Sequence, residues 1–109
     1  KRQNVGLALT RADLGQDPGQ RATLVQFSSA FCAPCRATRQ VLTHVAATVD
    51  GVRHVEVDAE SHLDLVRRMG VTRTPTTFVL DHRGQVVQRS TGVPRLAQVV
   101  GLVDSMGSK

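Results

Sequence analysis

The spacing of apolar and polar residues along the chain predicts strands and helices that alternate. Runs rich in β-branched or aromatic residues predict strands, and apolar residues three and four positions apart predict amphipathic helices. The expected strands cover residues 5–9, 23–28, 52–58, 76–80 and 85–90. The expected helices cover a single turn at 11–14, a long segment from 33 to about 49, then 61–70 and 96–103.

Two of these helices have ends and faces that the sequence predicts in more detail. Ser61 is expected to begin the third helix, with Asp64 in the capping-box position and Gly70 at its end. The residues expected to face inward are Leu63, Val66 and Met69 in this helix and Leu96, Val99, Val100 and Val103 in the last one.

The order of these elements is β-α-β-α-β-α-β-β-α, which is typical of an α/β protein. An early βαβ crossover and a late hairpin, with its turn at Asp81-His82-Arg83-Gly84, predict a mixed sheet of four to five strands with helices on both faces. The 109 residues suffice for one domain, with a core at about 5–105 and a frayed polar tail at 105–109.

The net charge of +5 comes almost entirely from arginine, since all but two of the 14 basic residues are arginines. These arginines are dispersed, and aromatic residues make up only 3% of the chain, so nucleic-acid binding is poorly supported. We interpret the charge mainly as a solvated surface. Steering of an acidic partner and proximity to anionic lipid are the remaining interpretations.

The N-terminus indicates a possible membrane attachment beyond this chain. The sequence holds neither a run of eighteen apolar residues nor a signal peptide, and it starts at Lys1 instead of a methionine. Lys1 and Arg2 resemble the basic flank of an anchor. We therefore expect the native product to extend into an N-terminal hydrophobic anchor.

The only two cysteines form the motif Cys32-Ala33-Pro34-Cys35, between an expected strand and an expected helix. Cys32 is placed to cap the helix, where its sulfur can accept the N–H of Cys35 and lies at the positive end of the helix dipole. Both effects favour the thiolate, which is the nucleophile in disulfide exchange. Pro34 fits the first helical turn because the N–H it lacks would be unpaired there.

Two other interpretations of the motif are weaker. A structural zinc site needs four ligands, but there is no second CxxC, and His44, His54, His62 and His82 are scattered. A structural disulfide between residues three apart closes too small a loop to stabilise the fold much. We therefore expect a reactive dithiol and no metal ligands.

From about residue 23 to 103 the chain resembles the thioredoxin family. The resemblance rests on the segment from Phe27 to Cys35, on Val71-Thr72-Arg73-Thr74-Pro75-Thr76, and on Asp81-His82-Arg83-Gly84 with Gly92. The helix passes directly into the next strand at residues 49–52, without the insertion of TlpA-like relatives, which favours the compact thioredoxin branch.

The resemblance implies a role for each matching residue. Cys32 corresponds to the exposed nucleophile and Cys35 to the shielded resolving cysteine. Pro75 corresponds to a cis-proline beside the dithiol, Thr74 to the residue whose backbone binds substrate, and Gly92 to a glycine that leaves room for it. The other residues expected to contact substrate are Phe31, Ala33 and Pro34.

The chain also departs from the family pattern. Phe31 replaces the usual tryptophan, Ala33 a glycine, Gln26 a buried aspartate and His54 a lysine. The usual proton acceptor for Cys35 is therefore missing. Glu56 shares a strand face with His54 and is a possible substitute, with ordinary surface positions as the alternative.

The resemblance implies a thiol-disulfide oxidoreductase, acting as a reductase in electron transport and cell redox homeostasis. The expected partners are protein disulfides and an unidentified redox partner, and the only redox group expected is the Cys32–Cys35 pair, with no separate cofactor. We expect a bacterial monomer in the cytoplasm or anchored at its membrane face, with an exported location still open. The rival is a thioredoxin-fold binding or metal-delivery module whose dithiol is silent or holds metal.

Overall fold

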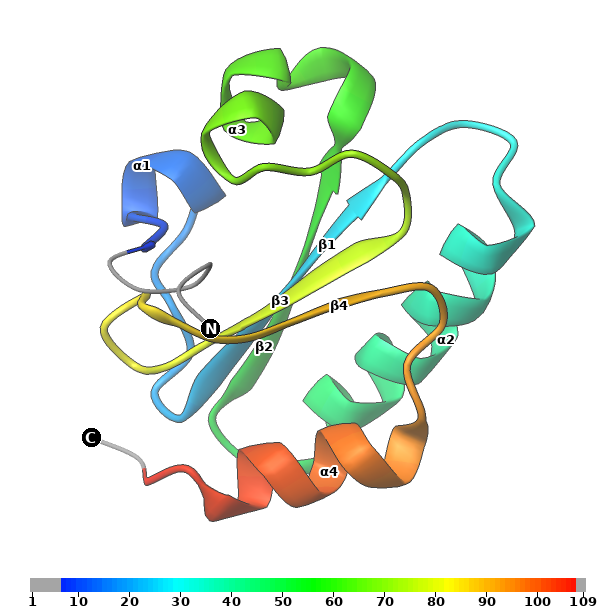
Figure 1. The fold of residues 1–109 in the computed structure, drawn as a ribbon. Coiled ribbons are helices and arrows are strands. Elements are labelled where there is room, and N and C mark those ends of the chain that lie inside the picture. The colour runs from blue at the N-terminus through cyan, green and yellow to red at the C-terminus, as the bar shows by residue number, and fades with distance from the viewer. Residues whose placement is uncertain (1–6, 108–109) are drawn as a thin grey trace.

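The computed structural model describes residues 7–107, which fold into one four-stranded sheet between two layers of helices (Figure 1). The strands lie in the order β2-β1-β3-β4, with β1 parallel to β2 and the other neighbours antiparallel. The elements are α1 (Arg11–Leu14), β1 (Ala22–Ser28), α2 (Ala33–Thr48), β2 (Val52–Asp58), the 3₁₀ turn η1 (Ala59–Ser61), α3 (Leu63–Arg68), β3 (Thr76–Leu80), β4 (Val86–Thr91) and α4 (Leu96–Ser105). The expected mixed sheet is confirmed.

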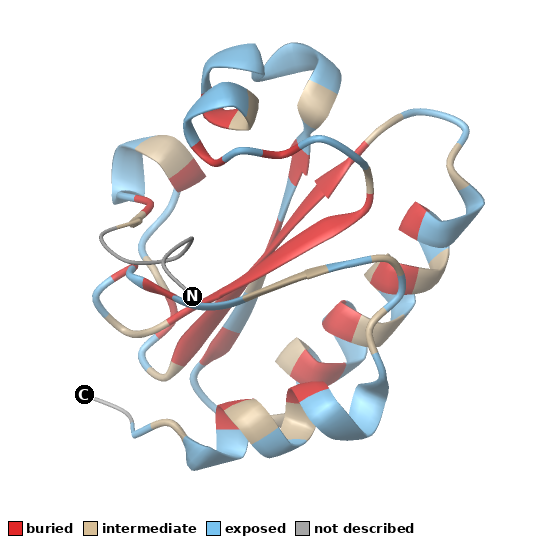
Figure 2. Ribbon diagram, in the orientation of Figure 1, coloured by how far each residue is buried: buried red, intermediate tan, exposed pale blue. Residues whose placement is uncertain are grey.

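A separate hydrophobic core fills each side of the sheet. On the side of α1 and α3, residues such as Phe27, Phe78 and Met69 form one cluster, and on the side of α2 and α4, Leu24, Leu42 and others form a second. Strands β1 and β3 are buried along their whole length because both of their faces are covered (Figure 2). This burial explains why their sequences are nearly continuous apolar and β-branched runs.

The strand register brings four strand ends to the same edge of the sheet. Ser28, which ends β1, lies opposite Asp58, which ends β2. On the other side of β1, Phe27 lies opposite Thr76 at the start of β3, and Thr76 lies opposite Thr91 at the end of β4. The segments that follow β1 and β4 and the segment that precedes β3 therefore meet at this edge, where the cysteines lie.

The N-terminal and C-terminal expectations are only partly met. Residues 1–6, with the expected anchor flank and part of the expected strand at 5–9, lie outside the described residues, and the described part forms one isolated bridge between Ala8 and Gln85. Ser105 ends α4, and the Met106 carbonyl accepts a 2.8 Å hydrogen bond from Arg21, so ordered contacts reach residue 106, and fraying of the tail stays a prediction. No helix among residues 7–107 has the length and apolar character to cross a membrane.

The predicted start of α3 is wrong. Ser61 is the last residue of the 3₁₀ turn that Asp58 caps, and its hydroxyl donates to the Asp58 carboxylate, so it belongs to this turn and not to the start of α3. The N-cap of α3 is His62, which makes no side-chain capping bond. This later start changes which residues face the core: Leu65 and Met69 are buried, whereas Leu63 is exposed. In α4, Leu96 is likewise exposed, while Val99 and Val103 are buried.

Candidate active site

The two cysteines form a disulfide at the N-terminus of α2. Cys32 is the N-cap residue, and its Sγ accepts a 3.2 Å hydrogen bond from the backbone N–H of Cys35, as the sequence predicted. The Cα atoms of the two cysteines lie 5.1 Å apart. Cys35 is buried, with 1% of its surface exposed, whereas Cys32 is only half-buried, so an incoming sulfur atom has access to Cys32.

The residue before Cys32 makes the turn from β1 into α2. Phe31 has a φ of 55° and is the one non-glycine residue of the described chain in the left-handed region, which β-carbon sterics disfavour. Its side chain is fully exposed, and Ala33 and Pro34 are exposed as well. This backbone conformation therefore presents an aromatic ring to solvent beside the accessible sulfur.

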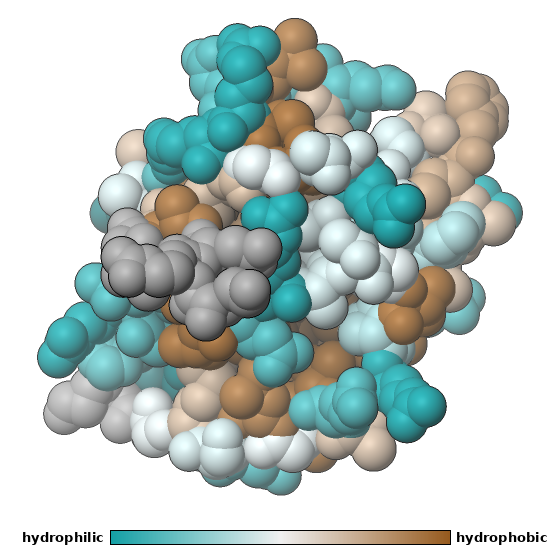
Figure 3. Space-filling view, in the orientation of Figure 1, coloured by the Kyte–Doolittle hydropathy of each residue, from teal (hydrophilic) through white to brown (hydrophobic). Residues whose placement is uncertain are grey.

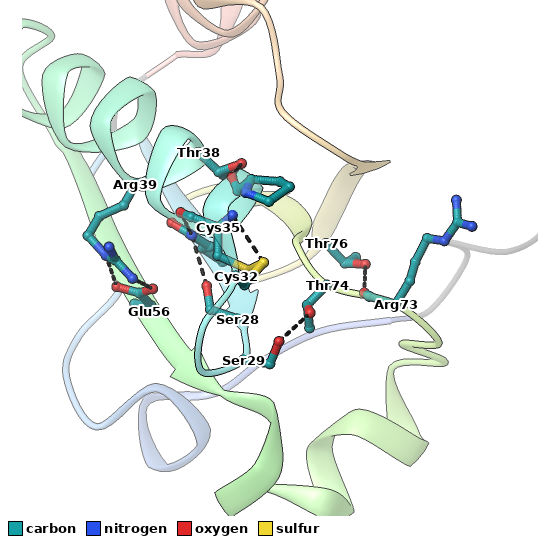
Figure 4. Close-up of a disulfide and its surroundings, with 12 residues drawn as sticks. Ser28, Ser29, Cys32, Cys35, Thr38, Arg39, Glu56, Arg73, Thr74 and Thr76 are labelled. Carbon is teal, nitrogen blue, oxygen red and sulfur yellow. Dashed lines mark hydrogen bonds and ion pairs between the residues drawn. A yellow bond between two sulfur atoms is a disulfide. The ribbon is translucent and has the colours of Figure 1, made fainter.

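Two hydrogen bonds join the dithiol loop, the loop before β3 and the end of β4 in series. The hydroxyls of Ser29 and Thr74 lie 2.7 Å apart, which links the dithiol loop to the loop that precedes β3 (Figure 4). The Thr74–Pro75 peptide bond is cis, which confirms what the resemblance implied. The backbone N–H of Gly92 donates to the carbonyl oxygen of Pro75 at 3.0 Å. Thr74, Pro75 and Gly92 are thus held at the same edge as the cysteines.

A neutral polar network lies behind Cys35. Gln26 is fully buried, and its Nε2 donates to the Cys35 carbonyl and to Ser28 Oγ, both at 2.8 Å. Since a carbonyl oxygen only accepts, the NH₂ group of Gln26 must face Cys35 and its Oε1 must face His54, 3.0 Å away. His54 therefore carries its proton on Nε2. Burial lowers the pKa of His54, which keeps the ring neutral. The positive charge of Arg39 also lowers this pKa, whereas the negative charge of Glu56 raises it.

Glu56 lies beside this network in a two-pronged ion pair with Arg39. Arg39 Nε and Nη2 donate to the two carboxylate oxygens at 2.7 and 2.6 Å (Figure 4). This hydrogen bonding lowers the pKa of Glu56 in spite of partial burial, and the Ser28 hydroxyl acts in the same direction. A cleft of about 330 Å³, lined by residues that include Ser28, Arg39 and Glu56, opens this region to solvent.

The structure thus assembles the predicted residues in two groups. One group lies at the end of the sheet that carries the disulfide: Cys32, Cys35, Phe31, Ala33, Pro34, Thr74, Pro75 and Gly92. Glu56 lies apart from it on β2, paired with Arg39. Sequence reasoning missed Ser29 and Arg39. Their partners are 45 and 17 residues away along the chain, so only the tertiary structure reveals these pairs. Among residues 7–107, no three His, Cys, Asp or Glu side chains are grouped so as to hold a metal ion.

Comparison with known proteins gives one consistent family. The family model described as Thioredoxin matches residues 12–105. The chain is 32% identical to thioredoxin H2 of Arabidopsis thaliana over 72 residues, which are 66% of this chain and 53% of that protein. It is 30% identical to mitochondrial thioredoxin-3 of Saccharomyces cerevisiae over 81 residues, 74% of this chain and 63% of that protein.

Solved structures share the fold of this chain. A mutant thioredoxin from Halobacterium salinarum superposes with a TM-score of 0.71 at 21% identity, over 79% of this chain and 74% of that one, which shows the fold. The chain spans between about half and two thirds of the two curated relatives above. With the family model matching most of its length, this chain belongs to the thioredoxin family, whose members are thiol-disulfide oxidoreductases.

Proposed function

We propose that this protein reduces disulfide bonds in other proteins through Cys32 and Cys35. The observation that carries the proposal is the position of Cys32 Sγ, half-buried at the N-cap of α2, while Cys35 is buried behind it. The N–H of Cys35 and the dipole of a 16-residue helix both favour negative charge on the Cys32 sulfur. These features suit Cys32 for attack and Cys35 for resolution.

The reaction proceeds in two exchanges. In the reduced protein, the Cys32 thiolate attacks one sulfur of the substrate disulfide, forms a mixed disulfide and expels the other substrate sulfur as a thiolate. Cys35 then loses its proton and attacks Cys32 Sγ, which releases the second substrate sulfur. Two electrons pass to the substrate, and the protein is left with the Cys32–Cys35 disulfide seen here.

The loops beside the disulfide provide a site for the substrate chain. Thr74, next to Pro75, presents backbone groups, and Phe31 presents an exposed apolar ring. A redox partner must then return two electrons to the disulfide. We propose that the reaction takes place in the bacterial cytoplasm or at the cytoplasmic face of the membrane, where thiols are kept reduced. We also propose that the active protein is a monomer.

An insulin-reduction assay with dithiothreitol as electron source tests this proposal. We expect the protein to accelerate the precipitation of reduced insulin chains, and Cys32→Ser to abolish this effect. Equilibration with glutathione should give a potential in the reducing range of the family. A protein that binds soft metal ions at the dithiol but leaves insulin oxidised would contradict the proposal and support a metal-delivery module.

A further inference from the structure

The arginines of the described residues divide into groups by their contacts. Four of them pair with carboxylates: Arg11, Arg39, Arg67 and Arg68. Three donate to backbone carbonyls: Arg21, Arg53 and Arg89. The other four are exposed and make no side-chain hydrogen bond or ion pair with another residue of the described chain: Arg36, Arg73, Arg83 and Arg95.

Three of these four unpaired arginines lie in the segments that meet at the end of the sheet where the cysteines lie. Arg36 directly follows Cys35, Arg73 lies two residues before Pro75, and Arg95 lies three residues after Gly92. The Ser29–Thr74 and Gly92–Pro75 hydrogen bonds hold these three segments together at one sheet edge. The segments 28–36, 70–76 and 91–96 contain no aspartate or glutamate, so their charge is entirely positive.

Two acidic residues border this end of the sheet on the other side of β1, in the cleft that Ser29 and Ala30 also line. Glu56 and Asp58 are on β2, at the end of the strand order opposite β4. Glu56 is held by Arg39, and Asp58 accepts hydrogen bonds from the Glu60 backbone and the Ser61 hydroxyl. In Figure 4, Arg73 extends outward on the far side of the disulfide from the Arg39–Glu56 pair. The unpaired positive charge therefore lies over β1, β3 and β4.

We propose that Arg36, Arg73 and Arg95 select substrates whose disulfide is flanked by acidic residues. This inference rests on the proposed reductase function and names its substrate class. Charged groups at the rim of a binding site raise the rate of encounter with a partner of opposite charge and disfavour a partner of like charge. Guanidinium groups without an internal partner are free to pair with a carboxylate of the substrate.

An acidic protein suits this surface better than anionic lipid does. The three arginines share their sheet edge with the disulfide, so a bilayer bound to them would cover Cys32 and exclude its substrate. The face shown in Figure 3 also presents its brown apolar residues in separate patches among polar ones, where membrane insertion would favour one continuous apolar area. Attraction to a folded or extended acidic chain leaves the sulfur accessible.

Three synthetic disulfide peptides test this inference. They share one core sequence and are flanked on both sides by glutamate, glutamine or lysine. At low salt we expect kcat/KM to be about tenfold higher for the glutamate peptide than for the lysine peptide, the lower end of electrostatic steering. The ratio should approach one at about 1 M salt, where the screening length falls to about 3 Å.

Variants assign the effect to particular side chains. The triple variant Arg36→Gln, Arg73→Gln, Arg95→Gln should lose most of the glutamate-to-lysine ratio. Arg83→Gln is the matched control, because Arg83 is also exposed and unpaired in the described chain but lies in the β3–β4 turn, at the other end of these strands. It should keep the ratio. Comparing peptides within each protein removes any effect of the amount of folded protein.

The outcomes separate this inference from the function on which it rests. If no peptide is reduced, including the glutamine peptide, the reductase proposal itself fails. If all three peptides are reduced equally, the reductase proposal stands and the substrate class is wrong. An unchanged glutamate-to-lysine ratio in the triple variant would show that these arginines do not cause the preference. Equal peptide rates, together with arginine-dependent sedimentation on phosphatidylserine vesicles, would overturn the inference in favour of lipid.

Discussion

The side-chain amide of Gln26 donates a 2.8 Å hydrogen bond to the carbonyl oxygen of Cys35. This bond places a neutral group directly behind the resolving cysteine. An amide cannot take a proton from a thiol near neutral pH, and His54 presents its protonated Nε2 to the same amide. The buried network therefore orients Cys35 but provides no base in direct contact with it. We expect the second exchange to be the slow step.

Replacing Gln26 with aspartate should accelerate that step. A general base in place contributes roughly 10²–10⁴-fold, and we expect about tenfold here because the shorter side chain is not ideally placed. The change should also cost about 1–3 kcal/mol, since the Cys35 carbonyl loses its donor. Burial should raise the pKa of the new carboxyl above its ordinary value. Stopped-flow reduction of a model disulfide resolves the two exchanges.

Gln26→Asn is the control for this experiment, because it shortens the side chain by the same amount without adding an ionisable group. The asparagine variant should lose stability but gain no rate. Equal second-step rates in the two variants would show that the new carboxyl does not accept the proton, and that another group or water already does.

Glu56 is our candidate for that other group. It lies on β2 in the cleft that Ser28 and Arg39 also line, so a proton from Cys35 would have to reach it through water. Arg39 lowers its pKa and so weakens it as a base, which limits the expected effect of Glu56→Gln to a slowing of a few-fold in the second exchange. The first exchange should not change. A second exchange as fast as in the parent protein would exclude Glu56 as proton acceptor.

The buried ring of His54 should make stability depend on pH. Burial lowers its pKa from 6.5, so below that value the unfolded chain binds a proton that the folded protein resists. The free energy of unfolding should therefore be highest above about pH 6.5 and should fall as the pH drops towards the lowered pKa. Denaturant titrations at about pH 7.5 and about pH 5.5 measure this difference.

His54→Gln should reduce that pH dependence, because glutamine keeps an N–H donor for Gln26 but does not titrate. His44, exposed on α2, provides the comparison, and His44→Gln should leave the dependence in place. Three carboxylates also have a lowered pKa: those of Asp13, Glu56 and Asp58. Their stabilising effect is lost only when the pH falls below the ordinary pKa values of these groups, 3.8 to 4.5. A dependence that survives in His54→Gln would contradict the assignment.

The sequence predicted the parts of this fold that local pattern determines. The β1 run is apolar because both of its faces are covered, and α2 shows the helical spacing because one of its faces packs on the sheet. Cys32 is the N-cap because Pro34 suits the first turn of the helix and the Cys32 sulfur accepts the N–H of Cys35. The cis bond at Pro75 came from the family resemblance, since no local pattern distinguishes it from a trans bond.

The errors and omissions arise where tertiary contacts decide. Ser61 had the correct spacing for a capping box, but it is taken up in the 3₁₀ turn that Asp58 caps, and α3 begins later. Strand alternation correctly placed His54 and Glu56 on one face of β2. It could not show that the first would contact Gln26 and the second Arg39, because those partners come from β1 and α2.

Mass spectrometry of trapped mixed disulfides tests the central claim most directly. Cys35→Ser removes the resolving sulfur, so when this variant is mixed in its reduced form with a disulfide protein, it should accumulate a covalent complex joined through Cys32 and cleaved by dithiothreitol. The matched Cys32→Ser variant should form none, because its remaining thiol is buried. A complex that forms through Cys35 but not through Cys32, or no complex with either variant, would contradict the account.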